Sequence, residues 1–176
     1  MNRIIRFSLF IFFILISSGC GMTMRTNTQV PSIAIKEINE MSFKNDVSLR
    51  NVATNKGEEQ IGKWIGWKVI GDLYKYTESA IGAAKNSLEE QGIEVNDNAD
   101  KVLELAVFDA LSEQGMVKFR LTTKLRVKTG DGLEKEFTGI HNYANGYGTT
   151  FATERALAQC VVHMLNDADI RRYLAK

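Results

Sequence analysis

The sequence predicts an α+β domain in which an antiparallel sheet of about four strands carries two main helices on one face. Residues 117–128, VKFRLTTKLRVK, alternate apolar and polar side chains without interruption, as a strand buried on one face does. Apolar residues recur at helical spacing in 77–92 and again in 149–176. The expected elements then follow in the order strand, helix, three strands, helix, with short links between the last strands that suit antiparallel neighbours.

The first half of the domain gives weak signals. Pro31 opens a strand over residues 32–38, because a proline at the first position of a strand removes no ladder hydrogen bond. Residues 41–60 are polar and predict a loop. Residues 61–76 contain three glycines, which argue against a helix and favour a hairpin or an ordered loop.

Two tryptophans, Trp64 and Trp67, lie in this glycine-containing segment beside Lys63 and Lys68. Exposed aromatic rings next to cations suit a membrane interface or a protein partner. Packed rings would instead close one end of the core, which is the commoner role of large aromatic residues.

The second half gives stronger signals. Thr77 is expected to cap a helix that ends at Gly92 and has small residues on its apolar stripe. Asp169 is expected to cap a short turn at the end of the chain. Three strands and the closing helix are expected at residues 101–111, 117–128, 133–143 and 149–176.

The Gly-Asp-Gly loop at 130–132 sets the register of the last two strands. It places Leu125 opposite Phe137 on the apolar face and Arg126 opposite Glu136 on the polar face. The cations of the first strand therefore meet acids across the pair. We interpret the cationic row as a charge ladder that faces solvent, not as a site for a polyanion.

The hairpin before it predicts a candidate surface. A four-residue loop at 112–115 pairs Leu111 with Met116, which brings three apolar side chains of the preceding strand to the same side as two unpaired cations. That strand is then apolar on both faces, and its outer face is either covered by the chain's own helices or open to a partner. The candidate partner surface consists of Leu103, Leu105, Val107, Arg120 and Lys124.

Signatures of catalysis, metal binding and cofactor binding are missing from the sequence. His141 and His163 belong to different elements, and no cluster of Cys, Asp and His at ligand spacing lies near them, so we expect no metal. The glycines of residues 145–155, NGYGTTFATER, give only a weak signal for an anion site, and Cys160 is expected to be a buried thiol. We predict no catalytic residue, no cofactor and no enzyme activity.

The charge balance argues against nucleic acid as a partner. The chain has 22 Lys and Arg against 21 Asp and Glu, and its formal net charge is +1. Domains that bind nucleic acid are usually strongly basic. We expect no nucleic-acid partner.

The amino terminus is organised as an export signal. Arg3 and Arg6 precede an apolar run at residues 7–16, and small residues then lead to Cys20. The run is too short for a membrane span, which needs about 20 apolar residues. We expect residues 1–19 to be a signal peptide that is removed on export.

A cysteine directly after such a signal resembles the lipobox of bacterial lipoproteins. The resemblance implies that Cys20 is acylated and becomes the first residue of the mature protein, held in the membrane by its acyl chains. Gly21, where an Asp would favour the inner membrane, implies the periplasmic face of the outer membrane. Residues 20–30 are then a flexible tether and 31–176 a single α+β domain. The alternative is an ordinary secreted protein that is cut elsewhere.

The mature chain also resembles the YajG-like lipoproteins of Gram-negative bacteria. The features that carry the resemblance are the acylated cysteine, LEEQGIEV, LELAVFDA, the hairpin GMVKFRLTTKLRVKTGDGLEKEF and the tail RALAQCVVHMLNDADIRRYL. The family implies no catalytic residues. We therefore expect a non-enzymatic, lipid-anchored envelope protein that docks onto a partner, such as an outer-membrane assembly or transport complex. The alternative is a carrier that binds a lipid or another apolar ligand between sheet and helices.

Overall fold

A computed structural model describes residues 22–43, 45–116, 118–144 and 148–176. The expected signal peptide at 1–19 and the expected acylation of Cys20 lie outside these ranges. Within them, no helix is long and apolar enough to cross a membrane.

Seven strands among the described residues form one mixed sheet. They are β1 (Met22–Arg25), β2 (Val47–Asn51), β3 (Glu59–Trp64), β4 (Trp67–Gly71), β5 (Lys101–Gln114), β6 (Phe119–Thr129) and β7 (Glu134–Tyr143). Their order is β1-β4-β3-β5-β6-β7, and β2 also pairs with β5. The predicted sheet of about four antiparallel strands is therefore wrong. The pairs β1 with β4, β2 with β5 and β3 with β5 are parallel, and their long connections leave no hairpin signal in the sequence.

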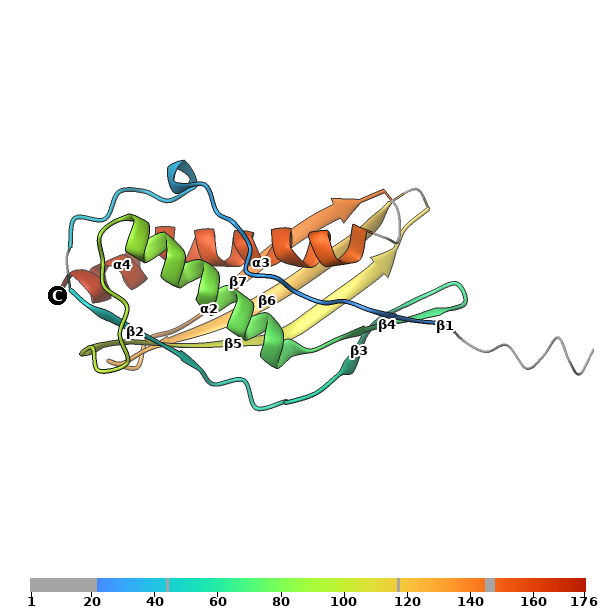
Figure 1. The fold of residues 1–176 in the computed structure, drawn as a ribbon, viewed down its shortest axis with the longest axis horizontal. Helices are drawn as coiled ribbons and strands as arrows, with labels where there is room; N and C mark the ends of the chain where they lie inside the picture. The colour runs from blue at the N-terminus through green and yellow to red at the C-terminus, as the bar shows by residue number, and fades with distance from the viewer. Residues whose placement is uncertain (1–21, 44, 117, 145–147) are drawn as a thin grey trace, which may run out of the picture.

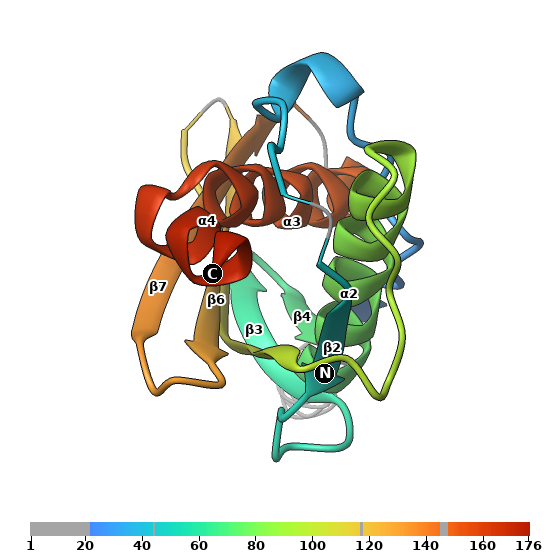
Figure 2. The ribbon, with the colours of Figure 1, turned by 90° about the vertical axis from the view of Figure 1, so that its left-hand side faces the viewer.

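Three α-helices of the described chain lie on one face of this sheet (Figures 1 and 2). They are α2 (Leu73–Glu90), α3 (Thr149–Asn166) and α4 (Ala168–Ala175), and one 3-10 turn, η1 (Ile35–Glu37), precedes them. The helix α2 packs on β2 and β5, whereas α3 packs on β6 and β7.

Aspartates begin two of the helices at positions that differ from the expected caps. The side chain of Asp72 accepts a hydrogen bond from the backbone N–H of Lys75 at 3.1 Å, so α2 begins before Thr77. Asp167, rather than Asp169, caps α4 and accepts hydrogen bonds from two backbone N–H groups there. A carboxylate that bonds the free N–H groups satisfies donors that have no partner inside the helix.

The pairing of β6 with β7 confirms the register predicted from the 130–132 loop. Leu125 lies opposite Phe137, and Arg126 lies opposite Glu136. The loop length and the need to keep apolar side chains on one face were sufficient to fix this register.

The pairing of β5 with β6 differs from the predicted one. β5 continues to Gln114, which pairs with Phe119, so the turn begins after Gln114 and not after Leu111 as expected. The register also shifts between Val107 and Asp109, which marks a β-bulge at Phe108. A bulge reverses the inward and outward positions on one side of it, and alternation in the sequence does not reveal it.

The N-terminal part of the described chain lies against the rest of the domain. β1 pairs with β4, so residues 22–25 are part of the sheet and not of the spacer expected at 20–30. The stretch MTMR alternates apolar and polar side chains, but it is too short to stand out as a strand. The chain then crosses the helices (Figure 1), with Val30 directly over Gly82. Residues 32–38, expected as a strand, contain η1 instead, and the expected loop 41–60 contains β2.

The core fills the space between the helices and the inner face of the sheet. The small residues Ala80 and Ala84 of α2 are fully buried where the helix packs on β2 and β5. Large side chains from both layers are fully buried there, among them Leu88, Leu103, Leu105, Leu121, Leu125, Leu157, Met164 and Leu165.

Candidate docking surfaces

The predicted partner surface is not a surface. Leu103, Leu105 and Val107 point toward the helices and are buried. The hydroxyl of Thr77, on α2, accepts a hydrogen bond from the backbone N–H of Val107 at 2.8 Å, which ties the helix to this strand. The predicted register had placed the three side chains outward. The observed register places Leu105 beside Val127 on the core face.

The cations assigned to that surface lie on the opposite face of the sheet. Lys124 forms an ion pair with Asp109 at 2.9 Å, and the hydrogen bond that Lys124 donates to this carboxylate raises the pKa of Lys124. The side chain of Arg120 donates a hydrogen bond to Asn142 at 3.3 Å. Arg126 contacts two glutamates of β7, at 3.1 and 3.0 Å. The three central cations of the row thus have partners, in agreement with a charge ladder, whereas Lys118 and Lys128 at its two ends form no salt bridge with the described residues.

An interruption in the sheet creates a groove beside β5. β2 pairs with β5 as far as Leu105, and β3 meets β5 at Ser112, so neither strand pairs with residues 106–111. A groove of about 360 Å³ lies here. We call it the gap groove, and it is lined by residues 52–55, Leu73, residues 106–108 and Arg126.

The gap groove combines apolar and cationic groups. The guanidinium of Arg126 lies over the ring of Phe108, 4.5 Å from the ring centre. Val52 is half-exposed at its edge, although large aliphatic side chains are mostly buried in this domain. The groove thus offers an aromatic ring, a cation that lies on it and an aliphatic rim in one place.

A second apolar surface lies at the end of the molecule where β1 begins. Ile65, in the β3–β4 turn, is 88% exposed, Met116, in the β5–β6 turn, is fully exposed, and Met22 is 53% exposed. The backbone N–H of Ile65 donates to the side chain of Gln114 at 3.0 Å, which links the two turns. The backbone N–H of Met22 donates to Gly66 at 3.1 Å. We call this surface the tip end, and a recess of about 650 Å³ lies between its two turns.

Aromatic rings support the tip end from below. Trp64 is buried, and its ring centre lies 4.5 Å from that of Phe119 and 6.5 Å from that of Tyr143. Its indole nitrogen is buried and has no hydrogen-bond partner among the described residues. Trp67 is half-buried. The tryptophans therefore close one end of the core, and the aliphatic residues of the turns form the exposed surface.

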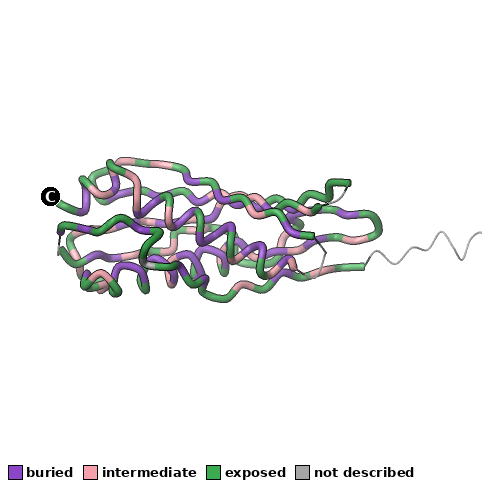
Figure 3. Tube along the Cα trace, turned by 90° about the horizontal axis from the view of Figure 1, so that it is seen from above, coloured by how far each residue is buried: buried purple, intermediate pink, exposed green. Residues whose placement is uncertain are grey.

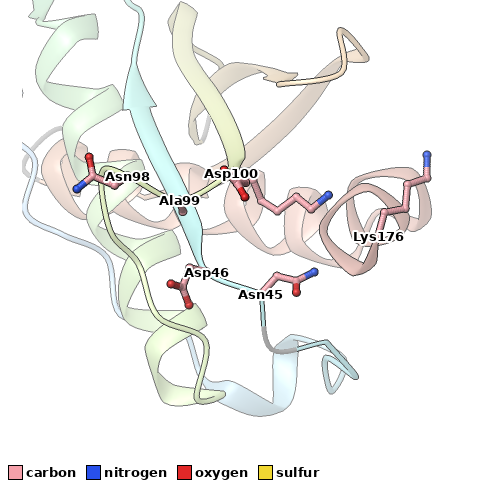
Figure 4. Close-up of a pocket in the computed structure, with 7 residues that line it drawn as sticks. Asn45, Asp46, Asn98, Ala99, Asp100 and Lys176 are labelled. Carbon is pink, nitrogen blue, oxygen red and sulfur yellow. The ribbon is translucent and has the colours of Figure 1, made fainter.

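A polar recess of about 560 Å³ lies at the opposite end of the molecule, near the C-terminus. Asp46 and Asp100 line it together with Lys101 and Lys176, so that its acids and bases balance. Figure 4 shows that the side chains of Asn98 and Lys176 point to opposite sides, so they do not converge on one ligand position. This arrangement gives no catalytic or metal-binding geometry.

The histidines and the cysteine described in the structure are not assembled into a reactive site. Burial and the nearby Arg155 lower the pKa of His141, and His163 contacts the backbone oxygen of Thr138 at 3.1 Å. Burial raises the pKa of Cys160 to about 11, which makes it a poor nucleophile at neutral pH. No group of three or more His, Cys, Asp or Glu side chains in the described ranges is placed to hold a metal ion.

The expected anion site lies only partly in the described ranges. Of residues 145–155, the structure describes those from Gly148 onward, and Gly148 precedes α3 without a side-chain cap. A helix start alone does not define an anion site. The sequence signal is therefore left without structural support.

Among known proteins, the chain shows similarity only to solved structures. No protein-family model and no curated protein matches the chain. The chain is similar to the crystal structure of protein XCC0632 from Xanthomonas campestris, of the family model DUF330. The two share 12% sequence identity with a TM-score of 0.49, and the match covers 82% of this chain and 93% of that chain. A likeness of this size carries no functional argument.

Proposed function

We propose that the protein is a non-enzymatic, lipid-anchored envelope protein of the YajG-like kind, which docks onto a protein partner through the gap groove. The anchor is the acylated Cys20, and the location is the periplasmic face of the outer membrane. The partner is an envelope protein, such as a component of an assembly or transport complex. The observation that carries the proposal is the interruption of the sheet beside residues 106–111.

The chemistry of the groove suits an apolar segment of a protein. A strand edge that pairs with no other strand forms backbone hydrogen bonds with an added segment, and here, among the described residues, only the N–H of Val107 is already bonded, to the hydroxyl of Thr77. Arg126 is of a residue type that often contributes much of the binding energy in protein interfaces, and aromatic residues such as Phe108 are enriched in them. Val52 and Ala106 provide aliphatic contacts beside them. A partner that places one large apolar side chain on the Phe108 ring would bury all three apolar residues.

The packing of the core favours docking over carriage of an apolar ligand. A carrier needs free volume between sheet and helices, but large side chains of both layers pack against each other there. The helix α3 approaches β7 so closely that a Cβ atom on Gly139 would overlap the backbone of Ala156. The gap groove and the tip end lie outside this interface.

The docking proposal is tested by photo-crosslinking in living cells. A photoreactive amino acid at Phe108 is expected to trap one discrete envelope protein, whereas the same group at Asn86, on the outer side of α2, is expected to trap none. Val52→Asp should abolish the crosslink because it places a carboxylate on the apolar rim. Ile140→Asp, which changes a similarly exposed side chain on β7, should preserve it.

Two results would count against this proposal. Equal crosslinking from Phe108 and Asn86 would show that the groove has no specific partner. Absence of a crosslinked protein in cells, together with a lipid that native mass spectrometry releases from the purified protein, would favour the carrier. The anchor is tested separately with Cys20→Ala. This variant should incorporate no labelled fatty acid, and the protein should be released from membranes.

A further inference from the structure

The turns of the tip end contain apolar residues that the turn conformations do not favour. Turn positions favour Gly, Asn, Asp and Ser, whose backbone or side chain suits the bend. Ile65 and Met116 occupy turns without a conformational advantage, and both are almost completely exposed. Met22 adds a third exposed apolar side chain next to the β3–β4 turn. Apolar residues that contradict local preference are expected at functional sites.

Three lysines lie directly behind these apolar residues. Lys63 and Lys68 are opposite each other in the β3–β4 hairpin, where two like charges repel. Lys118 follows the β5–β6 turn, and all three are exposed. None of the three takes part in a salt bridge within the described part of the chain. The tip end is thus an apolar surface with an unneutralised cationic rim.

The amino terminus fixes what the tip end faces. Cys20 precedes Met22 by two residues, and two residues span at most about 7 Å. Because β1 already belongs to the sheet at Met22, no long tether separates the acyl chains from the domain. Figure 1 shows both turns at the end of the molecule where β1 begins, and Figure 3 shows both of them exposed. The polar recess lies at the other end of β5, whose 14 residues extend roughly 45 Å.

We propose that the tip end is a membrane-contact surface, in which Ile65 and Met116 enter the headgroup region of the bilayer and the three lysines bind anionic phospholipids. Apolar side chains gain from leaving water at the bilayer boundary, and lysines near the surface are attracted to anionic lipids. The acyl chains hold the domain, and the tip end sets its orientation, with β5 pointing away from the membrane. The inference rests on the lipid anchor of the proposed function and is independent of the gap groove.

Fluorescence of the full-length, acylated protein in vesicles tests the contact. An environment-sensitive fluorophore is attached to Ile65→Cys or, at the opposite end, to Asp131→Cys. The remaining thiol, Cys160, is buried and does not compete for the label. In vesicles of phosphatidylethanolamine and phosphatidylglycerol, the label at position 65 is expected to shift to the blue and to be quenched by headgroup spin labels. The label at position 131 should show neither effect.

Charge reversal tests the cationic rim. Lys63→Glu with Lys68→Glu should decrease quenching at position 65, and so should vesicles without phosphatidylglycerol, because both remove the electrostatic attraction. Lys128→Glu, which changes an exposed lysine of β6 outside the tip end, should leave the quenching unchanged.

The outcomes separate the contact from the anchor. Wild-type protein that does not float with vesicles would contradict the anchor, and the contact with it. Protein that floats but has the same emission at positions 65 and 131 would contradict the contact alone. A label at position 65 that shows no shift in vesicles would also overturn the membrane contact if the unlabelled Ile65→Cys thiol is protected from thiol reagents in native envelopes, and would favour a protein at the tip end.

Discussion

Gly139, on β7, lies against the backbone of Ala156, on α3, with no space for a side chain between them. A Cβ atom on Gly139 would overlap the carbonyl oxygen of Ala156 and would lie 3.1 Å from the sulfur of Cys160. The helix α3 therefore rests on the sheet at the level of the backbone. This close approach requires glycine at position 139 because of space, not because of an unusual φ angle.

We predict that Gly139→Ala destabilises the domain by about 2 to 4 kcal/mol, because the helix has to move away from the sheet. The midpoint of chemical denaturation measures this change. Gly57→Ala is a suitable control, since φ is +140° at Gly57 and no atom lies within 4 Å of the added carbon. The control should cost about 1 kcal/mol through backbone strain alone. Equal midpoints for the two variants would contradict the close packing of α3.

The burial of Leu105 leads to a second prediction. Leu105→Asp should destabilise the domain by at least about 4 kcal/mol, because it removes a core side chain and buries an unpaired carboxylate. Total stabilities of domains are roughly 5 to 15 kcal/mol, so this substitution removes a large part of the stability, and the thermal midpoint should fall steeply. Lys128→Ser, on the exposed face of β6, should change the thermal midpoint very little. A Leu105→Asp variant with the thermal midpoint of the wild type would contradict the burial of Leu105.

Sequence patterns were sufficient where the structure is local. The hairpin of β6 and β7 follows from strict alternation and a three-residue loop, and its register was predicted correctly from Leu125 and Phe137. The region of α2 was also predictable, although its start was not. The cap at Asp72 lies outside the apolar pattern and is visible only from its hydrogen bond to the helix.

Parallel pairing could not be predicted in the same way. The five residues of β2, VSLRN, lie in a polar segment and pair with β5 about fifty positions later in the chain. Val47 and Ser48 are both fully buried, so the strand does not alternate at its start. These two residues are buried by α2 and β5, which lie far away in the sequence, so the pattern within the segment does not indicate their burial.

The candidate surfaces were missed for two physical reasons. The bulge at Phe108 reverses the facing of the residues around it, and this moved Leu105 from the predicted surface into the core. The tip end depends on contacts between distant turns, of which the hydrogen bond from Ile65 to Gln114 is one. An apolar residue in a turn was visible in the sequence, but its neighbours were not.

The hydrogen bond between α2 and β5 leads to a third prediction. The buried hydroxyl of Thr77 donates to Leu73 at 2.9 Å and accepts from the N–H of Val107 at 2.8 Å. Thr77→Val keeps the shape but leaves that N–H without an acceptor, which should cost about 1 to 3 kcal/mol. Amide exchange at Val107 should become faster. Thr77→Ser retains the hydroxyl and should preserve slow exchange, and fast exchange in both variants would exclude the hydroxyl as the acceptor.

The last prediction concerns the buried thiol of Cys160 at high pH. Its folded-state pKa is raised to about 11 by burial, against 9.0 for an ordinary thiol. Between these values the unfolded chain binds fewer protons than the folded one, so the free energy of unfolding falls as the pH rises through this window. The full loss is about 2 to 3 kcal/mol and is absent below pH 9.

Cys160→Ala isolates this contribution. Tyr76 and Tyr143 also have raised pKa values because of burial, and their contribution is common to the wild type and the variant. We expect denaturation midpoints at pH 8 and pH 10.5 to differ less in Cys160→Ala than in the wild type, whatever the cost of the cavity at pH 8. Identical pH slopes, or rapid alkylation of the folded wild type at pH 8, would show that the thiol is accessible to water. In that case α3 does not pack on β7 as closely as Gly139 indicates, because the same contact buries both residues.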